Sequence, residues 1–250
     1  MVLLNQFHDI LPGSSIAWVH RVAREEYAQI LVELRGLSDA AIAALGGGEP
    51  AMLNALDHEV RRVLATGDGT LRMVAAPPLA VTPLAEELRE PSAPATARRE
   101  GTSVVMENSR VRAVIEPDGS IASVTDLVRG REVLLSGAGG ARLRAFEDVP
   151  NAFDAWDIER HHLNPGNELP VPEAESVEIV TARGLRAEVR VTRVLGASRL
   201  LQTIFLDADA PQLDFSLEAD WQERETLLKM SFPLAVRARE HAAEGQFGHI

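Results

Sequence analysis

The organisation of this chain depends on twelve residues near its amino terminus, which read Asn5-Gln6-Phe7-His8-Asp9-Ile10-Leu11-Pro12-Gly13-Ser14-Ser15-Ile16. The Pro-Gly pair breaks the backbone, and Ser14 or Ser15 can cap a helix that follows. The break places His8 and Asp9 side by side on a tight connection between apolar residues. An isolated pair of this kind most often caps a turn.

After the break, apolar residues recur at steps of three and four, which is the pattern of one face of an amphipathic helix. These residues are Ile16, Val19, Ala23, Tyr27, Ile30 and Leu34. The helical pattern continues over 40–45, and the glycines at 46–48 end it. A single long helix cannot bury its own apolar face, so we expect it to pack against partner helices.

From residue 49 onward the sequence predicts strands rather than helices. Short apolar segments up to Ala75 indicate a small β module, and residues 86–100, rich in Pro, Ala and charge, predict an exposed connector. From residue 103 to Trp221, apolar and polar residues alternate in segments that turn residues separate. We therefore predict an antiparallel β-sandwich.

The composition narrows the classes of function. The chain has 250 residues, of which 46% are hydrophobic, enough for a sizeable core in one or two domains. Its net charge of −12 argues against a nucleic acid or a membrane surface as partner, since both need a basic face. The absence of cysteine excludes disulfides and thiolate zinc ligands. With no secretory signal after Met1, we expect a cytoplasmic protein.

The opening stretch closely resembles the Asn-Gln-Phe-His-Asp-Ile-(Ile/Leu)-Pro-Gly-Ser-Ser-Ile motif of glycoside hydrolase family 38, the zinc-dependent α-mannosidases. Further segments resemble motifs of the same family in the same order, with Phe153 in place of a usual Trp. They are 107–111, 118–126, 146–150, 154–158, 220–224, 227–229, 232–233 and 246–250. The resemblance therefore covers nearly the whole chain.

The resemblance implies a fold that is mainly β with an N-terminal helical part. Residues 1–48 would be the end of a three-helix bundle, 49–100 a small β module and linker, and 101–250 part of a large antiparallel, galactose-mutarotase-like sandwich. The family's catalytic barrel precedes these regions. We therefore expect the nucleophile, the general acid and the other zinc ligands upstream of this chain, with no catalytic residue in the chain itself.

The resemblance also assigns roles to single residues. His8 would be a zinc ligand, and Asp9 would accept hydrogen bonds from sugar hydroxyls. Trp156 and Asp157 could line the sugar site, since an aromatic face and a carboxylate suit carbohydrate, although core packing is an alternative for Trp156. We expect the adjacent histidines at 161–162 to be a solvated loop pair rather than metal ligands.

These observations predict a fragment of a retaining α-mannosidase whose substrates are α-mannosides and whose cofactor is zinc. We expect the fragment alone to be inactive, because one ligand does not hold a metal ion. Two alternatives stay open, namely a non-catalytic carbohydrate-binding or structural β-sandwich, and a nonfunctional gene fragment. The sequence does not predict the oligomeric state.

Overall fold

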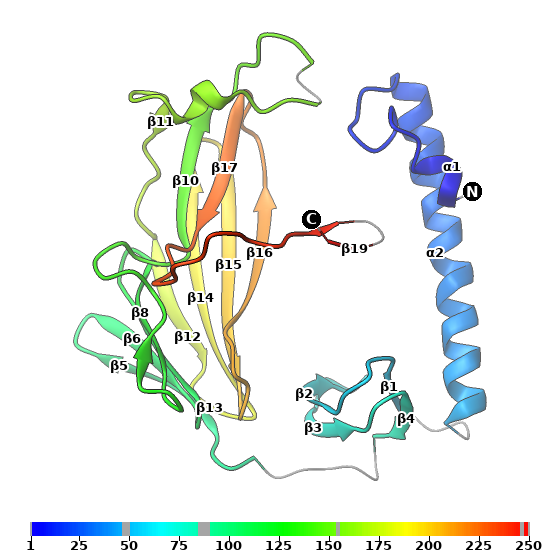
Figure 1. Ribbon diagram of the computed structural model, residues 1–250, viewed down its shortest axis with the longest axis vertical. Coiled ribbons are helices and arrows are strands. Elements are labelled where there is room, and N and C mark those ends of the chain that lie inside the picture. Colours follow the sequence, from blue (N-terminus) through cyan, green and yellow to red (C-terminus); the bar gives the residue numbers. More distant parts are fainter. Residues whose placement is uncertain (1, 47–50, 85–90, 154–155, 246–247, 250) are drawn as a thin grey trace. The chain divides into compact units, whose positions relative to one another are not determined.

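The computed structural model describes residues 2–46, 51–84, 91–153, 156–245 and 248–249 (Figure 1). The chain divides into two compact units. The first comprises Met1–Ser92, Ala145–Pro170 and Glu223–Leu228, and the second comprises Ala93–Arg144, Val171–Gln222 and Lys229–Ile250. The chain is mainly β with an N-terminal helical part, which confirms the predicted fold class. None of the helices in the described ranges is long and apolar enough to cross a membrane.

The helical part of the first unit consists of the short α1 (Val2–Asn5) and the long α2 (Ala17–Leu45). The predicted serine cap of α2 is wrong. Ile16 occupies the N-cap position with an extended backbone, and no side chain caps the helix. The hydroxyls of Ser14 and Ser15 instead reach back to Asp9, so they close the loop before the helix.

The predicted apolar face of α2 is covered only in its first half. Ala23 is buried, and Val19, Tyr27 and Ile30 are half-buried. From Leu31 to Leu45 the large apolar side chains are mostly exposed; they include Leu31, Val32, Leu34, Leu37 and Leu45. The second half of this helix therefore has an apolar surface that the described residues leave open to solvent.

The predicted small β module consists of two antiparallel pairs. β1 (Ala51–Asn54) pairs with β4 (Ala80–Pro83), and β2 (Val60–Ala65) pairs with β3 (Leu71–Ala76). The buried amide of Asn54 donates hydrogen bonds to three backbone carbonyls, those of His58, Ala76 and Pro77, at 2.8, 3.1 and 2.8 Å. These bonds tie the loop after β1 to the end of β3.

A three-stranded sheet has the order β11-β10-β17. Its strands are β11 (Glu168–Leu169), β10 (Arg142–Glu147) and β17 (Thr226–Ser231), and a 3₁₀ helix, η1 (Arg160–Leu163), precedes β11. β10 pairs antiparallel with β11 through Ala145 and Phe146.

The second unit is built on two antiparallel sheets, ordered β13-β5-β6-β7-β8-β9 and β12-β14-β15-β16. Their strands are β5 (Ala95–Glu100), β6 (Ser103–Glu107), β7 (Val111–Ile115), β8 (Ile121–Asp126), β9 (Arg131–Glu132), β12 (Ser176–Thr181), β13 (Arg183–Gly184), β14 (Arg186–Leu195), β15 (Ser198–Asp207) and β16 (Asp214–Asp220). A further short pair joins β18 (Glu244–Gly245) to β19 (Gly248–His249). One buried cluster contains residues of both large sheets, among them Met106 and Ile115 from the first and Val189 and Ile204 from the second. The predicted sandwich is therefore present.

The structure corrects the predicted connector at 86–100. Residues 95–100 form β5, within the unit that begins at Ala93. Ala95 and Ala97 point into the core, whereas Arg98 and Glu100 lie on the outer face. The alternation was not recognised because its inward residues are only alanines. Residues 85–90 lie outside the described part of the chain, as does the predicted boundary at residue 48.

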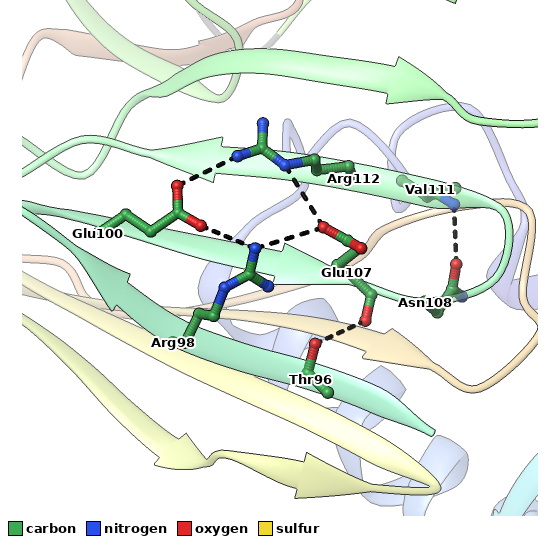
Figure 2. Close-up of polar contacts among 7 residues, drawn as sticks. All are labelled: Thr96, Arg98, Glu100, Glu107, Asn108, Val111 and Arg112. Atoms are coloured by element: carbon green, nitrogen blue, oxygen red, sulfur yellow. Dashed lines mark hydrogen bonds and ion pairs between the residues drawn. The ribbon is translucent and has the colours of Figure 1, made fainter. Parts of the chain in front are cut away.

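Four charged side chains form a closed ring on the outer face of β5, β6 and β7 (Figure 2). Arg98 lies 2.7 Å from Glu100 and 3.5 Å from Glu107, and Arg112 lies 3.2 Å from Glu100 and 3.4 Å from Glu107. Each carboxylate thus contacts two guanidiniums. Because all four side chains are partly exposed, we expect each pair to contribute little to stability.

Asn108, at the turn between β6 and β7, joins the two sheets of the sandwich. Its buried amide nitrogen donates to the carbonyl oxygens of Asp207 and Ala210 at 2.7 and 2.9 Å. Its side-chain oxygen accepts from the backbone N–H groups of Arg110 and Val111, both at 2.8 Å, the second of which Figure 2 shows. One side chain therefore satisfies backbone groups of its own turn and of the end of β15.

Asp207 is itself fixed by an ion pair. Arg186 contacts its carboxylate with two nitrogens, at 2.6 and 2.9 Å, and hydrogen bonding to Asp207 raises the pKa of the Arg186 guanidinium. The guanidinium also lies over the Phe205 ring, 4.3 Å from its centroid. The carbonyl that Asn108 binds thus belongs to a well-anchored residue.

We expect Asn108→Ala to lower the free energy of unfolding by about 2–4 kcal/mol, because it leaves buried donors and acceptors of both sheets without partners. The matched control is Ser109→Ala, which removes only an exposed hydrogen bond to Asp209 and should cost at most about 0.5 kcal/mol. Urea denaturation of both variants checks this. Equal midpoints for the two would contradict the role of Asn108.

We also expect the purified chain to associate, because the second half of α2 exposes apolar side chains to water. Leu34→Glu with Leu37→Glu should reduce association, whereas Val128→Glu, at another exposed apolar position, should not. Static light scattering at micromolar concentration measures the mean mass. A wild-type monomer with a cooperative melt would show that the exposed face needs no partner.

Candidate functional site

The loop between α1 and α2 positions the predicted site residues His8 and Asp9. The backbone N–H of Ile10 donates to the Phe7 carbonyl at 2.8 Å. The Ser15 hydroxyl donates to the Asp9 carbonyl at 2.6 Å, and the Ser14 hydroxyl donates to the Asp9 carboxylate at 3.3 Å. The turn is therefore closed by its own backbone and by both serines, and it presents the Asp9 carboxylate on its surface.

The start of this loop is anchored on α2. Asn5 is buried, and its amide donates to the Glu26 carboxylate at 2.8 Å. At the other end of the loop, Gly13 has a φ of 85°, a backbone conformation that residues with a Cβ rarely adopt. The sequence motif thus supplies an anchor, a turn glycine and two loop-closing hydroxyls around the His-Asp pair.

His8 and Asp9 face one another and are open to solvent. The His8 Nε2 lies 3.6 Å from the Asp9 carboxylate, and 67% and 49% of the two side chains are exposed. This distance is longer than a hydrogen bond, so the pair is a loose contact. Both groups are free to bind a ligand from outside.

Two aromatic rings lie near the His8 imidazole. The Phe7 centroid is 4.2 Å from it and the Trp156 centroid 6.2 Å, with planes tilted by 46° and 45°. Phe7 is 52% exposed and Trp156 is 50% exposed. The alternative that Trp156 packs in the core is therefore wrong. Phe7, a member of the same motif, was missed as a site residue although it adjoins His8.

Trp156 and Asp157 stand on a tight turn. Their backbone N–H groups donate to the Phe153 carbonyl at 2.7 and 2.9 Å, and Phe153 has a positive φ of 56°. Asp157 is exposed. The turn therefore presents both predicted substrate-binding residues, Trp156 and Asp157, to solvent.

The histidines at 161–162 differ from expectation. They belong to the 3₁₀ helix η1, and His162 is buried rather than solvated. Its Nδ1 lies 2.7 Å from the Glu159 carbonyl, and its ring meets Phe146 edge-on at 5.3 Å. A single helical turn has no apolar periodicity that the sequence could have revealed. His162 is thus a structural residue of the first unit.

The loop supplies only some of the ligands that a metal ion needs. An imidazole and a carboxylate are donors that zinc accepts, and a zinc site commonly takes three or more protein ligands. Over the residues that the structure describes, no group of three or more His, Cys, Asp or Glu side chains is close enough to hold a metal ion. The donor types therefore fit zinc, but these residues supply only part of a ligand set.

Two family models match the chain. Residues 106–250 match the "Glycosyl hydrolases family 38 C-terminal domain", and residues 1–45 match the "Alpha mannosidase middle domain". The first match alone covers more than half of the chain. The second includes the whole loop that presents His8 and Asp9.

Similar proteins carry related names. "Alpha-mannosidase 2C1" of Mus musculus is 33% identical over 265 residues and that of Homo sapiens is 32% identical, and each alignment covers 100% of this chain and 25% of the relative. "Alpha-mannosidase" of Saccharomyces cerevisiae is 26% identical over 261 residues, which cover 99% of this chain and 22% of the relative. The chain thus spans about a quarter of the length of the relatives it matches.

Proposed function

Because the chain belongs to glycoside hydrolase family 38, we propose that it works as part of a longer, zinc-dependent, retaining α-mannosidase that hydrolyses terminal α-mannosidic bonds. The single observation that best supports this is the solvent-open His8–Asp9 pair beside the half-exposed rings of Phe7 and Trp156. The relatives that match the whole chain are named as α-mannosidases. A carbohydrate substrate follows from that name and from the chemistry of the pair.

In this proposal His8 is one ligand of the zinc ion, and the other ligands come from outside these 250 residues. Bound zinc would polarise sugar hydroxyls and hold the sugar in place. The imidazole suits this role because it is exposed and lies beside a carboxylate that can orient it. The nucleophile and the acid of a retaining glycosidase would likewise lie on the remainder of the enzyme.

Asp9, Trp156 and Asp157 would bind the sugar. A carboxylate accepts two charge-assisted hydrogen bonds from neighbouring hydroxyls, and the Asp9 carboxylate is held by Ser14. The exposed face of Trp156 offers an apolar surface for the C–H side of a sugar ring.

A second candidate function is carbohydrate binding without chemistry. The observation that favours it is that two aromatic rings and two carboxylates are exposed on one unit that holds only part of a metal site. Mannoside binding by the chain without turnover would support this alternative.

We expect the 250-residue chain with added zinc to release no nitrophenol from an aryl α-mannoside, because it supplies only part of a metal site and, in this proposal, neither the nucleophile nor the acid. Absorbance at saturating substrate measures the release. Turnover above a zinc blank that a chelator abolishes would show that the chain contains a complete active site.

Loss of a residue that only hydrogen-bonds to a metal ligand lowers metal affinity roughly 10- to 100-fold. In the full-length enzyme, His8→Ala should lower zinc affinity by more than this, because in this proposal His8 binds the metal itself. Asp9→Asn should retain zinc and lower kcat/KM for a mannoside by about 10- to 100-fold, since an amide replaces a charged acceptor. Atomic spectroscopy of dialysed protein and steady-state kinetics separate the two effects.

The matched control is His58→Ala. His58 is also an exposed histidine beside an aspartate, with its Nδ1 3.0 Å from Asp57, but it lies outside the motif. It should change neither zinc content nor kinetics. If His8→Ala behaved like His58→Ala, the His8–Asp9 pair would have only a structural role.

A further inference from the structure

The second unit contains a cavity of about 330 Å³ that the proposed function does not use. Its wall is mainly apolar, with Ile121, Val124 and Leu134 from the region of β8 and β9, and Leu213, Phe215 and Phe232 from the region of β16 and β17. Phe215 and Phe232 meet edge-to-face at 5.3 Å. Phe232 is 42% exposed, so the cavity opens to solvent.

Charged side chains stand where the cavity meets solvent. Arg110 and Arg129 line it and are exposed, and Asp126 also lines it. Arg129 forms an ion pair with Asp126 at 2.9 Å, and its hydrogen bond contributes most to lowering the pKa of that carboxyl group, so Asp126 stays ionised and offsets Arg129. Within the described ranges no acidic side chain pairs with the Arg110 guanidinium.

Arg110 is thus an available cation at the edge of an apolar space, on a protein whose net charge is −12. Its backbone is fixed, because its N–H donates to the Asn108 side chain at 2.8 Å. A guanidinium binds a carboxylate with paired hydrogen bonds. A sugar suits this space poorly, since its hydroxyls would face apolar side chains without partners.

The volume limits the size of the occupant. At about 30 Å³ for each water-sized group, 330 Å³ holds about eleven such groups, close to the lower bound of small-molecule sites. This is the size of a short amphiphile rather than of a long lipid chain.

We propose that this cavity binds an organic anion with an apolar body of about ten non-hydrogen atoms, such as a medium-chain carboxylate, whose carboxylate pairs with Arg110. The apolar chain lies among Ile121, Val124, Leu134 and the two phenylalanines. The cavity residues belong to the second unit and the His8–Asp9 loop to the first.

Isothermal titration of the 250-residue chain with octanoate and with 1-octanol tests the proposal, because the two probes share an alkyl chain and differ in charge. Octanoate should bind at one site with a Kd on the order of 1 mM or tighter. Arg110→Gln should weaken octanoate about tenfold and leave 1-octanol unchanged. The matched control is Arg199→Gln, at an exposed arginine of β15 that does not line the cavity, and it should change neither.

Val124→Phe, which fills the cavity, should weaken both probes, and near-UV circular dichroism verifies that the variant is folded. If this variant does not fold, the comparison of the two probes in Arg110→Gln still decides. No octanoate binding, or equal binding by the Arg110 and Arg199 variants, would overturn the proposal. Undiminished binding to folded Val124→Phe would place the ligand elsewhere and overturn it as well.

Discussion

The sandwich depends on four hydrogen bonds made by one buried amide, that of Asn108. Two of them hold the end of β15 and the turn after it, and two hold the backbone of the turn that leads into β7. A serine has too few donors for this task, and an aspartate has none when ionised. Because the turn is fixed, so are the backbones of Arg110 and Val111, which border the cavity. The side chain that joins the two sheets therefore also holds the backbone at one border of the candidate anion site.

Patterns in the sequence were sufficient where a face of an element is large and apolar. The helix α2 was predicted from apolar residues at steps of three and four. The strands β7, β8, β12, β14, β15 and β16 were predicted because Val, Ile, Leu and Phe alternate with polar residues in them. β5 was missed because its inward residues are alanines, and the serine cap was wrong because a hydroxyl can also bond backward to a loop. The burial of His162 depends on Phe146, a tertiary contact that no local pattern contains.

In the candidate site, too, the sequence predicted the local features but not the tertiary contacts. The motif was enough to single out His8 and Asp9, since both belong to one short loop. Their surroundings come from elsewhere in the chain: Glu26 holds Asn5 from the next helix, and Trp156 reaches His8 from a distant turn. The sequence could suggest Trp156 as a sugar-binding residue but not its position beside the imidazole.

The same amide has a consequence for the chemical lifetime of the protein. Asparagine is among the residues that heat damages first, and its side chain must move freely for the neighbouring backbone nitrogen to attack it. In the native fold, Asn108 is held by four partners and protected from water. Whenever the sandwich opens, that protection ends. Hydrolysis to aspartate would set a negative charge against the carbonyl oxygens of Asp207 and Ala210, so a brief unfolding could become a permanent loss. The rate at which the protein is lost in this way then depends on how often the sandwich unfolds.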